Sequence, residues 1–166
     1  MARNPFSHRA SRLDSGLSAM KNIIFPYGIR FQEDGKIAVF PAAQARIKSS
    51  TSESLLGTFL IDSGATISVL PAGDAEVLGI DLQKGTKIVI RGLGATDFLG
   101  YRHVIQCEIQ KRTLKLPVVF VDHPATLRIF GREGLFKKFI IVFDEQKQRT
   151  LFLDPNMRIC IEKLLD

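Results

Sequence analysis

The chain is built from short runs of β-branched and aromatic residues, separated at close spacing by turn signals. Val, Ile, Phe and Tyr favour the pleated, half-buried surface of a strand, whereas polar clusters such as QEDG and DEQKQ favour turns. This spacing leaves little room for long helices, so it predicts an all-β barrel or sandwich. Strands are expected within residues 23–31, 36–40, 45–62, 86–109, 114–121 and 139–153, and a strand end is expected within residues 128–139.

Three short stretches have helical character instead. In residues 71–80, Asp74 is expected to cap a helix and Gly79 to end it. One helical turn is expected within residues 128–139, and a short helix is expected within residues 161–166. Helix is therefore a minor component of the predicted fold.

The 166 residues are enough for one domain, with or without a tail. Residues 1–22 are rich in Ser and have little periodicity, and they carry half of the net charge of +6. We expect a flexible basic leader at 1–22, a single folded domain at 23–155 and a C-terminal tail at 156–166. A nucleic-acid-binding arm is the alternative for the leader. Aromatic residues do not alternate with its basic ones, so nucleic acid is not an expected partner.

The sequence has no apolar run of about 18 residues, so no membrane span is expected. The N-terminus lacks the apolar core of a secretory signal, and we expect a cytoplasmic protein. Cys107 and Cys160 fit no metal-binding spacing, and in that compartment they are expected to be reduced thiols. The three His residues do not cluster with a Ser or Cys, which argues against a serine or cysteine protease and against a metal site.

An acidic residue stands at the end of an expected strand in the segment GTFLIDSGATISVLP. Asp62 follows the apolar run of residues 59–61, and a buried carboxylate is costly unless it has a partner or a purpose. Gly64 permits a tight turn, and Ser63 supplies a hydroxyl that can hydrogen-bond across a close contact. A carboxylate held in this way at an exit from the core suits catalysis.

FLIDSGATISVL resembles the active-site loop of retroviral-type aspartic proteases, the retropepsins, in which Asp-Thr/Ser-Gly-Ala follows two apolar residues. IRGLGATDFLGY is similar to their flap, and RIFGREGLF is similar to the apolar-apolar-Gly-Arg segment before their C-terminal helix. The three segments have the order and spacing of that family over residues 23–155. The resemblance implies a retropepsin-like closed β-barrel, the acid protease fold, with one short helix after the Gly-Arg motif. It also implies an aspartic endopeptidase that acts on protein or peptide substrates without a metal or cofactor.

The resemblance assigns roles to individual residues. Asp62 is the expected catalytic aspartate, and Ser63, Gly64 and Ala65 complete the active-site loop. The expected flap tip, which would bind substrate, and the second motif, which would be structural, comprise Gly92, Leu93, Gly94, Gly131 and Arg132.

Aspartic protease chemistry needs two carboxylates that share one proton. The sequence has one credible site and about half the length of a two-lobed pepsin. A second Asp-Ser-Gly, at residues 14–16, has no apolar strand before it and is interpreted as a chance match. The second carboxylate is therefore expected from another copy of the chain, in a homodimer whose two-fold axis brings both Asp62 side chains together.

Some features depart from the viral pattern. Retroviral enzymes often carry an acid directly after the Ala, where this chain has Thr66, which leaves the ion-pair partner of Arg132 open. The segment at 139–153 is longer than in compact viral enzymes and is similar to that of cellular and bacterial relatives. It leaves open which strands form the dimer sheet.

Several alternatives stay open at the level of sequence. Asp62 could be a turn acid that ends a strand, the Gly-rich segment at 92–94 an ordinary hairpin turn, and Arg132 a surface residue. For the whole chain, the alternative is a catalytically weak retropepsin-like module that dimerises or binds peptides. The natural substrate, and the choice among a bacterial housekeeping, phage or retroelement enzyme, are not determined.

Overall fold

The computed structural model describes residues 22–50, 52–91, 97–123 and 126–165. The described part is dominated by strands, so the all-β class predicted from the sequence is confirmed. The expected leader at 1–22 lies outside the described residues except for Asn22. The boundaries of the folded domain stay predictions.

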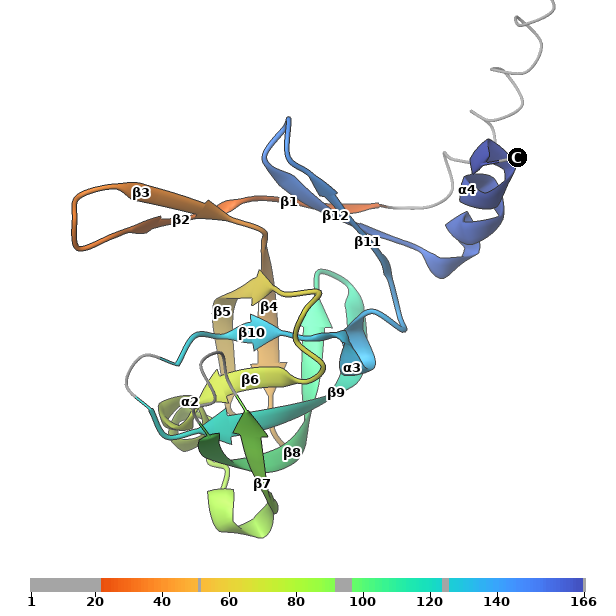
Figure 1. Ribbon diagram of the computed structural model, residues 1–166. Helices are drawn as coiled ribbons and strands as arrows, with labels where there is room; N and C mark the ends of the chain where they lie inside the picture. The colour runs from red at the N-terminus through yellow and green to blue at the C-terminus, as the bar shows by residue number, and fades with distance from the viewer. Residues whose placement is uncertain (1–21, 51, 92–96, 124–125, 166) are drawn as a thin grey trace, which may run out of the picture.

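A seven-stranded sheet forms the body of the molecule (Figure 1). Its spatial order is β4-β5-β10-β6-β9-β8-β7, and β4 also pairs with β8, so successive pairings lead from β4 back to β4. Most neighbours are antiparallel, but β10 runs parallel to β5 and β6 runs parallel to β9. The strands are β4 (Ala42–Lys48), β5 (Ser54–Ile61), β6 (Ser68–Pro71), β7 (Thr86–Arg91), β8 (Asp97–Ile109), β9 (Arg112–Val121) and β10 (Ile129–Phe130).

Alternating side chains of this sheet point into one hydrophobic core. Side chains of β5 alternate in exposure from Leu56 onward, and Phe59 and Ile61 near its end are buried. Phe59 stacks on Phe130 of β10, with ring centroids 4.0 Å apart. Buried side chains therefore lie beneath the end of β5, which is the point where the chain reaches Asp62.

A three-stranded sheet lies above the body in the view of Figure 1. It has the order β1-β12-β11, from β1 (Ile23–Pro26), β11 (Ile140–Asp144) and β12 (Arg149–Leu153). Phe152 packs edge-on against Phe25 and Phe139, and these rings join the core of the body. The expected last hairpin around DEQKQ is thus confirmed as β11–β12.

A separate hairpin of β2 (Gly28–Phe31) and β3 (Ile37–Phe40) projects sideways beyond the body (Figure 1). Its turn contains the expected QEDG sequence, and Gly35 adopts a φ of 79°, a left-handed conformation that favours glycine. The hairpin leads directly from the three-stranded sheet into β4.

The helices are short, as the sequence predicts. Helix α2 (Ala72–Val77) ends where Gly79 adopts a φ of 62° and Ile80 donates a hydrogen bond to the Ala75 carbonyl. The expected cap was wrong, because Pro71 precedes the helix and the Asp74 carboxylate lies inside it without capping it. The others are η1 (Leu82–Lys84), α3 (Arg132–Leu135), η3 (Pro155–Met157) and α4 (Arg158–Leu165).

Helix α3 is the expected turn after the Gly-Arg motif, although Glu133 and Gly134 have non-helical dihedral angles within it. Helix α4 contains most of the expected helix at 161–166. Within the described ranges, no helix is both long enough and apolar enough to cross a membrane.

Candidate active site

Asp62 stands where β5 leaves the sheet. Its backbone N–H donates to the Phe130 carbonyl at 3.0 Å, and the N–H of Ile61 donates to the Pro41 carbonyl at 2.9 Å. These bonds fix the end of the strand on both sides, while the buried side chain of Ile61 anchors it in the core. The Asp62 side chain itself is half-buried, so the carboxylate is held at the surface of a rigid strand end.

The residues after Asp62 form a tight loop around the carboxylate. The Gly64 N–H donates to Asp62 Oδ1 at 2.8 Å, and a Cβ on Gly64 would lie 3.2 Å from that same oxygen. Among the described residues this is the only hydrogen bond of the carboxylate, and the exposed Ser63 hydroxyl has none. The loop therefore presents a carboxylate and a hydroxyl outward, and both groups can form further hydrogen bonds.

The Gly-Arg segment lies directly beneath this loop. The Gly131 N–H donates to the Oγ of Ser68, which is fully buried, at 3.1 Å. A Cβ on Gly131 would lie 2.5 Å from the backbone carbon and oxygen of Ile67, so this position requires glycine. The structure thus brings together the first and second motifs that the sequence singled out.

Arg132 and Glu133 hold the loop from below through their backbone N–H groups. They donate to the carbonyls of Ala65 and Thr66 at 2.9 and 2.8 Å. The Arg132 side chain donates a hydrogen bond to Thr66 Oγ1 at 3.3 Å. The partner of Arg132 at this position is therefore the Thr66 hydroxyl, where retroviral enzymes often carry an acid. The Glu133 side chain pairs with Arg102 of β8 at 2.6 Å. This ion pair connects α3, which holds the Asp62 loop, to β8.

A second ion pair supports the strand beside Asp62. The Arg128 guanidinium donates to both carboxylate oxygens of Asp74 at 2.7 Å, and Asp74 is 4% exposed. Hydrogen bonding to Asp74 raises the pKa of Arg128 above its usual value. The Arg128 carbonyl also accepts the N–H of Leu60, two residues before Asp62. Helix α2 is in this way connected to the strand that carries the acid.

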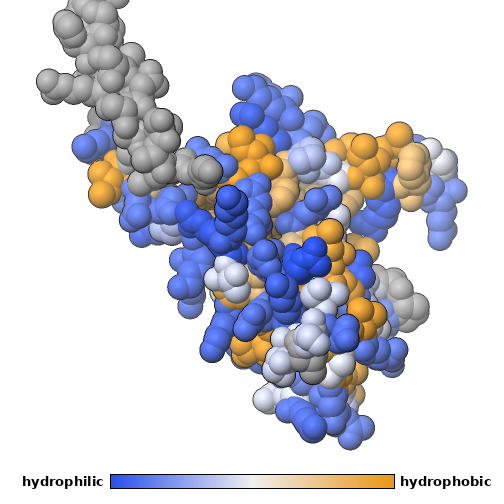
Figure 2. Space-filling model, turned by 180° about the vertical axis from the view of Figure 1, so that it is seen from behind, coloured by the Kyte–Doolittle hydropathy of each residue, from blue (hydrophilic) through white to orange (hydrophobic). Residues whose placement is uncertain are grey.

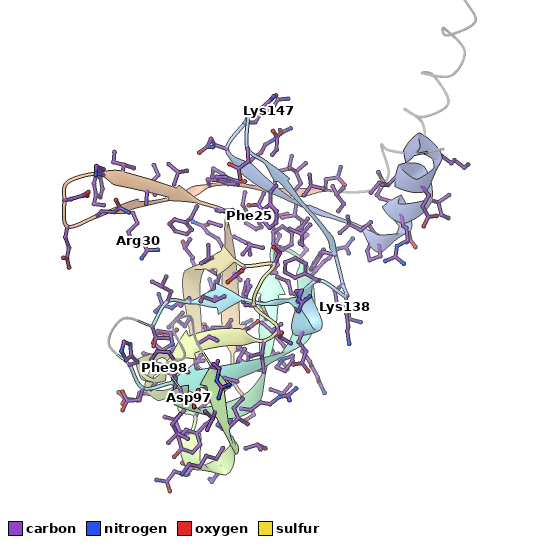
Figure 3. All side chains as sticks on the ribbon, in the orientation of Figure 1. Phe25, Arg30, Asp97, Phe98, Lys138 and Lys147 are labelled. Atoms are coloured by element: carbon purple, nitrogen blue, oxygen red, sulfur yellow. The ribbon has the colours of Figure 1, made fainter. Side chains whose placement is uncertain are left out.

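An apolar cavity of about 360 Å³ opens among five strands of the body. Phe98, labelled in Figure 3, lies in its wall, and its ring meets the His123 ring edge-on at 5.1 Å. The lining residues are mostly apolar, namely Val69, Ile90, Phe98, Val121, His123, Thr126, Leu127 and Ile129. Ile129 of this lining pairs with Leu60, two residues before Asp62, although Asp62 itself does not line the cavity.

The hairpin expected to carry the flap is formed by β7 and β8. At the end of the hairpin nearest its tip, Arg91 pairs with Asp97, with Nε 3.2 Å from Oδ1. The expected tip residues Gly92, Leu93 and Gly94 lie outside the described residues. The described strands of this hairpin nevertheless contribute to the apolar cavity, β7 through Ile90 and β8 through Phe98. In the part of the chain that the structure describes, no group of three or more His, Cys, Asp or Glu side chains could hold a metal ion.

Sequence reasoning missed the two ion pairs and the cavity. These residues are far apart in the sequence, and no local spacing signals their pairing; they are Arg102 in β8, Glu133 in α3, Asp74 in α2 and Arg128 just before β10. The cavity had a weak signal in the apolar run Ile88–Ile90 of β7, but the strands that complete the cavity were not assigned to one site.

Comparison with known proteins bears on this arrangement. A sequence model of the family described as "Aspartyl protease" matches residues 43–135, which include the Asp62 loop and the Gly131–Arg132 segment. A retropepsin-like aspartic protease from Rickettsia conorii has a similar structure, with a TM-score of 0.53 and 17% sequence identity over 81% of this chain and 95% of that one. An EIAV protease complexed with the inhibitor HBY-793 has a TM-score of 0.43 and 23% identity over 56% of this chain and 82% of that one. No curated protein matches the sequence.

Proposed function

The chain belongs to the aspartyl protease family, and on that premise we propose that it is an aspartic endopeptidase with Asp62 as its catalytic residue. Two Asp62 carboxylates from a homodimer would activate a water molecule between them. The observation that carries the proposal is the half-exposed Asp62 carboxylate, fixed at the end of β5 and hydrogen-bonded by Gly64, with the Gly131–Arg132 segment beneath it. The similarity to the Rickettsia protease supports the fold, and we propose that the β4-to-β8 pairings close the barrel expected of retropepsins.

The proposed reaction is a general acid–base hydrolysis. One carboxylate accepts a proton from the water, and the other, protonated, donates a hydrogen bond to the scissile carbonyl. The water oxygen adds to the carbonyl carbon, and the C–N bond then breaks as the amine is protonated. No covalent acyl-enzyme forms.

Other residues of the loop have supporting roles in this proposal. The Ser63 hydroxyl, which has no hydrogen-bond partner among the described residues, reaches the loop of the second copy, and Gly64 allows the two loops to approach. Ala65 offers its carbonyl to Arg132, so Gly131 and Arg132 hold the loop in position.

The substrate is a protein or peptide, and the cavity beside Asp62 indicates which side chains it accepts. A cavity of about 360 Å³ with a mostly apolar lining favours hydrophobic side chains near the scissile bond. The β7–β8 hairpin, with Gly92, Leu93 and Gly94 at its tip, would act as the flap that closes over the peptide and excludes water.

The proposal is tested with an unstructured protein as substrate. Asp62→Asn keeps the size of the side chain but removes the acid, so we expect peptidase activity to be lost while the far-UV circular dichroism spectrum is unchanged. The matched control is Asp14→Asn, in the other Asp-Ser-Gly sequence, which should cleave at the wild-type rate. Undiminished cleavage by Asp62→Asn would rule out the protease assignment.

A further inference from the structure

One face of the β2–β3 hairpin consists of exposed apolar side chains. Ile29 pairs with Val39 and Phe31 pairs with Ile37, and cross-strand partners in an antiparallel pair point to the same side. These four side chains, here called the arm face, are 64%, 48%, 77% and 58% exposed in the same order. Figure 2 shows the hydrophobic surface that results at the projecting end of the molecule.

The opposite face of the hairpin is turned toward the body. In Figure 3 the Arg30 side chain lies on the body side of the hairpin, where its guanidinium stands 5.8 Å from the centre of the Phe40 ring. Together with Thr58 and Leu60 of β5, Arg30 and Phe40 line a cavity of about 310 Å³, which Ile29 at the base of the arm face also borders. The body thus partners the face that carries Arg30 and Phe40, and it reaches only the Ile29 end of the arm face. An isolated two-stranded hairpin is only marginally stable in water, so an uncovered apolar face calls for a partner.

We infer that the arm face docks onto a second copy of this chain, an inference that rests on the proposed function. The hairpin is anchored beside the catalytic acid, because the Pro41 carbonyl at its base accepts the N–H of Ile61. A two-fold axis between the two Asp62 side chains makes this end of the molecule face the partner. From there the hairpin projects sideways beyond the body (Figure 1), and in the inferred dimer it would reach the second copy.

The active-site loop by itself is too small to hold a dimer together. A stable interface buries roughly 800 Å² on each partner. Residues 62–66 have short side chains with little apolar area, so they cannot supply an interface of that size. Additional apolar surface must come from the same end of the molecule. The arm face supplies it, together with Ile24 and Val142, which flank Leu151 on one face of the three-stranded sheet and are 46% and 37% exposed.

The charges at the hairpin tip favour a protein partner over a lipid surface. The turn carries Glu33 and Asp34, and the one cation beside them, Lys36, is already paired with Asp34 at 2.7 Å. Anionic membranes attract clusters of Lys and Arg and repel acids. A second copy, in contrast, carries the positive net charge of +6 that an acidic tip complements.

The test is sedimentation velocity of the full chain over a range of concentrations. Phe31→Ser/Ile37→Ser removes one cross-strand pair of the arm face, and Ile29→Ser/Val39→Ser removes the other. These side chains are exposed within one chain, so folding should be retained, and each double variant should raise the dimer dissociation constant at least about a hundredfold. The matched control is Leu56→Ser, 62% exposed at the far end of β5 from Asp62, which should dimerise as the wild type does.

The outcomes separate this inference from the proposed function, since sedimentation does not require activity. Wild-type dimerisation by both double variants, or a wild type that remains a monomer at every concentration, would overturn the interface. If the double variants dimerise normally and cleavage still requires Asp62, the interface alone fails. If the double variants are monomeric and Asp62→Asn still cleaves, the protease assignment fails and the interface stands.

Discussion

The buried carboxylate of Asp74 shows how a single residue supports the site at a distance. It lies in α2 at 4% exposure, and its partner Arg128 is 37% exposed in its side chain. An unpaired charge at that depth is costly, whereas two apolar residues of similar volume are often tolerated. The pair therefore stabilises the position of β10, which pairs directly with the strand that carries Asp62.

Removal of the Arg128 side chain should lower the free energy of unfolding more than is usual for a side chain that is partly exposed. We expect Arg128→Met to lower the free energy of unfolding by about 2 kcal/mol, because Asp74 is left buried and unpaired. Asp74→Leu/Arg128→Met should recover part of that loss. Lys48→Met is the control, since it breaks the exposed Lys48–Glu108 pair and should cost less than about 1 kcal/mol. Urea denaturation measures all three, and equal losses for Arg128→Met and Lys48→Met would contradict the argument.

Cys107 is a buried thiol whose reactivity should report the folded state. Burial raises its pKa to about 12, with a smaller contribution from Glu108. The thiolate is the reactive form, so at pH 8 only about one chain in ten thousand carries it in the folded state. In a Cys160→Ser background, a thiol reagent at pH 8 should modify Cys107 no faster than the chain unfolds. Modification at the rate of an exposed cysteine would show that this strand is accessible.

At the scale of elements, the close approach of two segments depends on a glycine. Gly131 has no room for a Cβ against the backbone of Ile67, whereas Gly73 in α2 has no atom within 4 Å of where a Cβ would lie. The two positions make a matched pair, because the same substitution meets backbone in one case and open space in the other.

Gly131→Ala should destabilise the protein by about 1–3 kcal/mol and lower peptidase activity, since the Asp62 loop must move to admit the methyl group. Gly73→Ala should stabilise it by about 0.5–1 kcal/mol, because alanine is the better helix former. Both values come from urea denaturation, and activity is assayed beside them. The packing argument fails if the two variants have the same stability.

The order of elements was predictable where the local pattern was strong. Runs of β-branched and aromatic residues, separated by polar or glycine-rich turns, placed the β2–β3, β4–β5, β7–β8 and β11–β12 hairpins. The cap at Asp74 was wrong because local propensity cannot weigh a competing ion pair with Arg128, which is 54 residues away in the chain. The parallel pairing of β10 with β5 was equally hidden, because a two-residue strand has no periodicity of its own.

For the whole molecule, Asp62 was selected as the candidate catalytic residue from its strand and its Asp-Ser-Gly sequence, and that role stays a prediction. The support beneath it was found only in part, since Gly131 and Arg132 carry a recognisable motif and the Arg102–Glu133 pair does not. The apolar arm face was not predicted either. Its residues alternate as in any half-buried strand, and only the arrangement of the chain reveals that the body leaves them exposed.

In the proposed enzyme, two chains together make one active site, and each contributes a single Asp62. A mixing experiment tests this arrangement most directly. Wild-type enzyme is held at a fixed concentration above the dimer dissociation constant, and Asp62→Asn chains are added before the subunits are allowed to exchange. The account predicts that activity falls to about half at an equal amount of Asp62→Asn and continues to fall with excess, because wild-type chains become trapped in heterodimers. Activity that stays constant whatever the amount of added Asp62→Asn would contradict it.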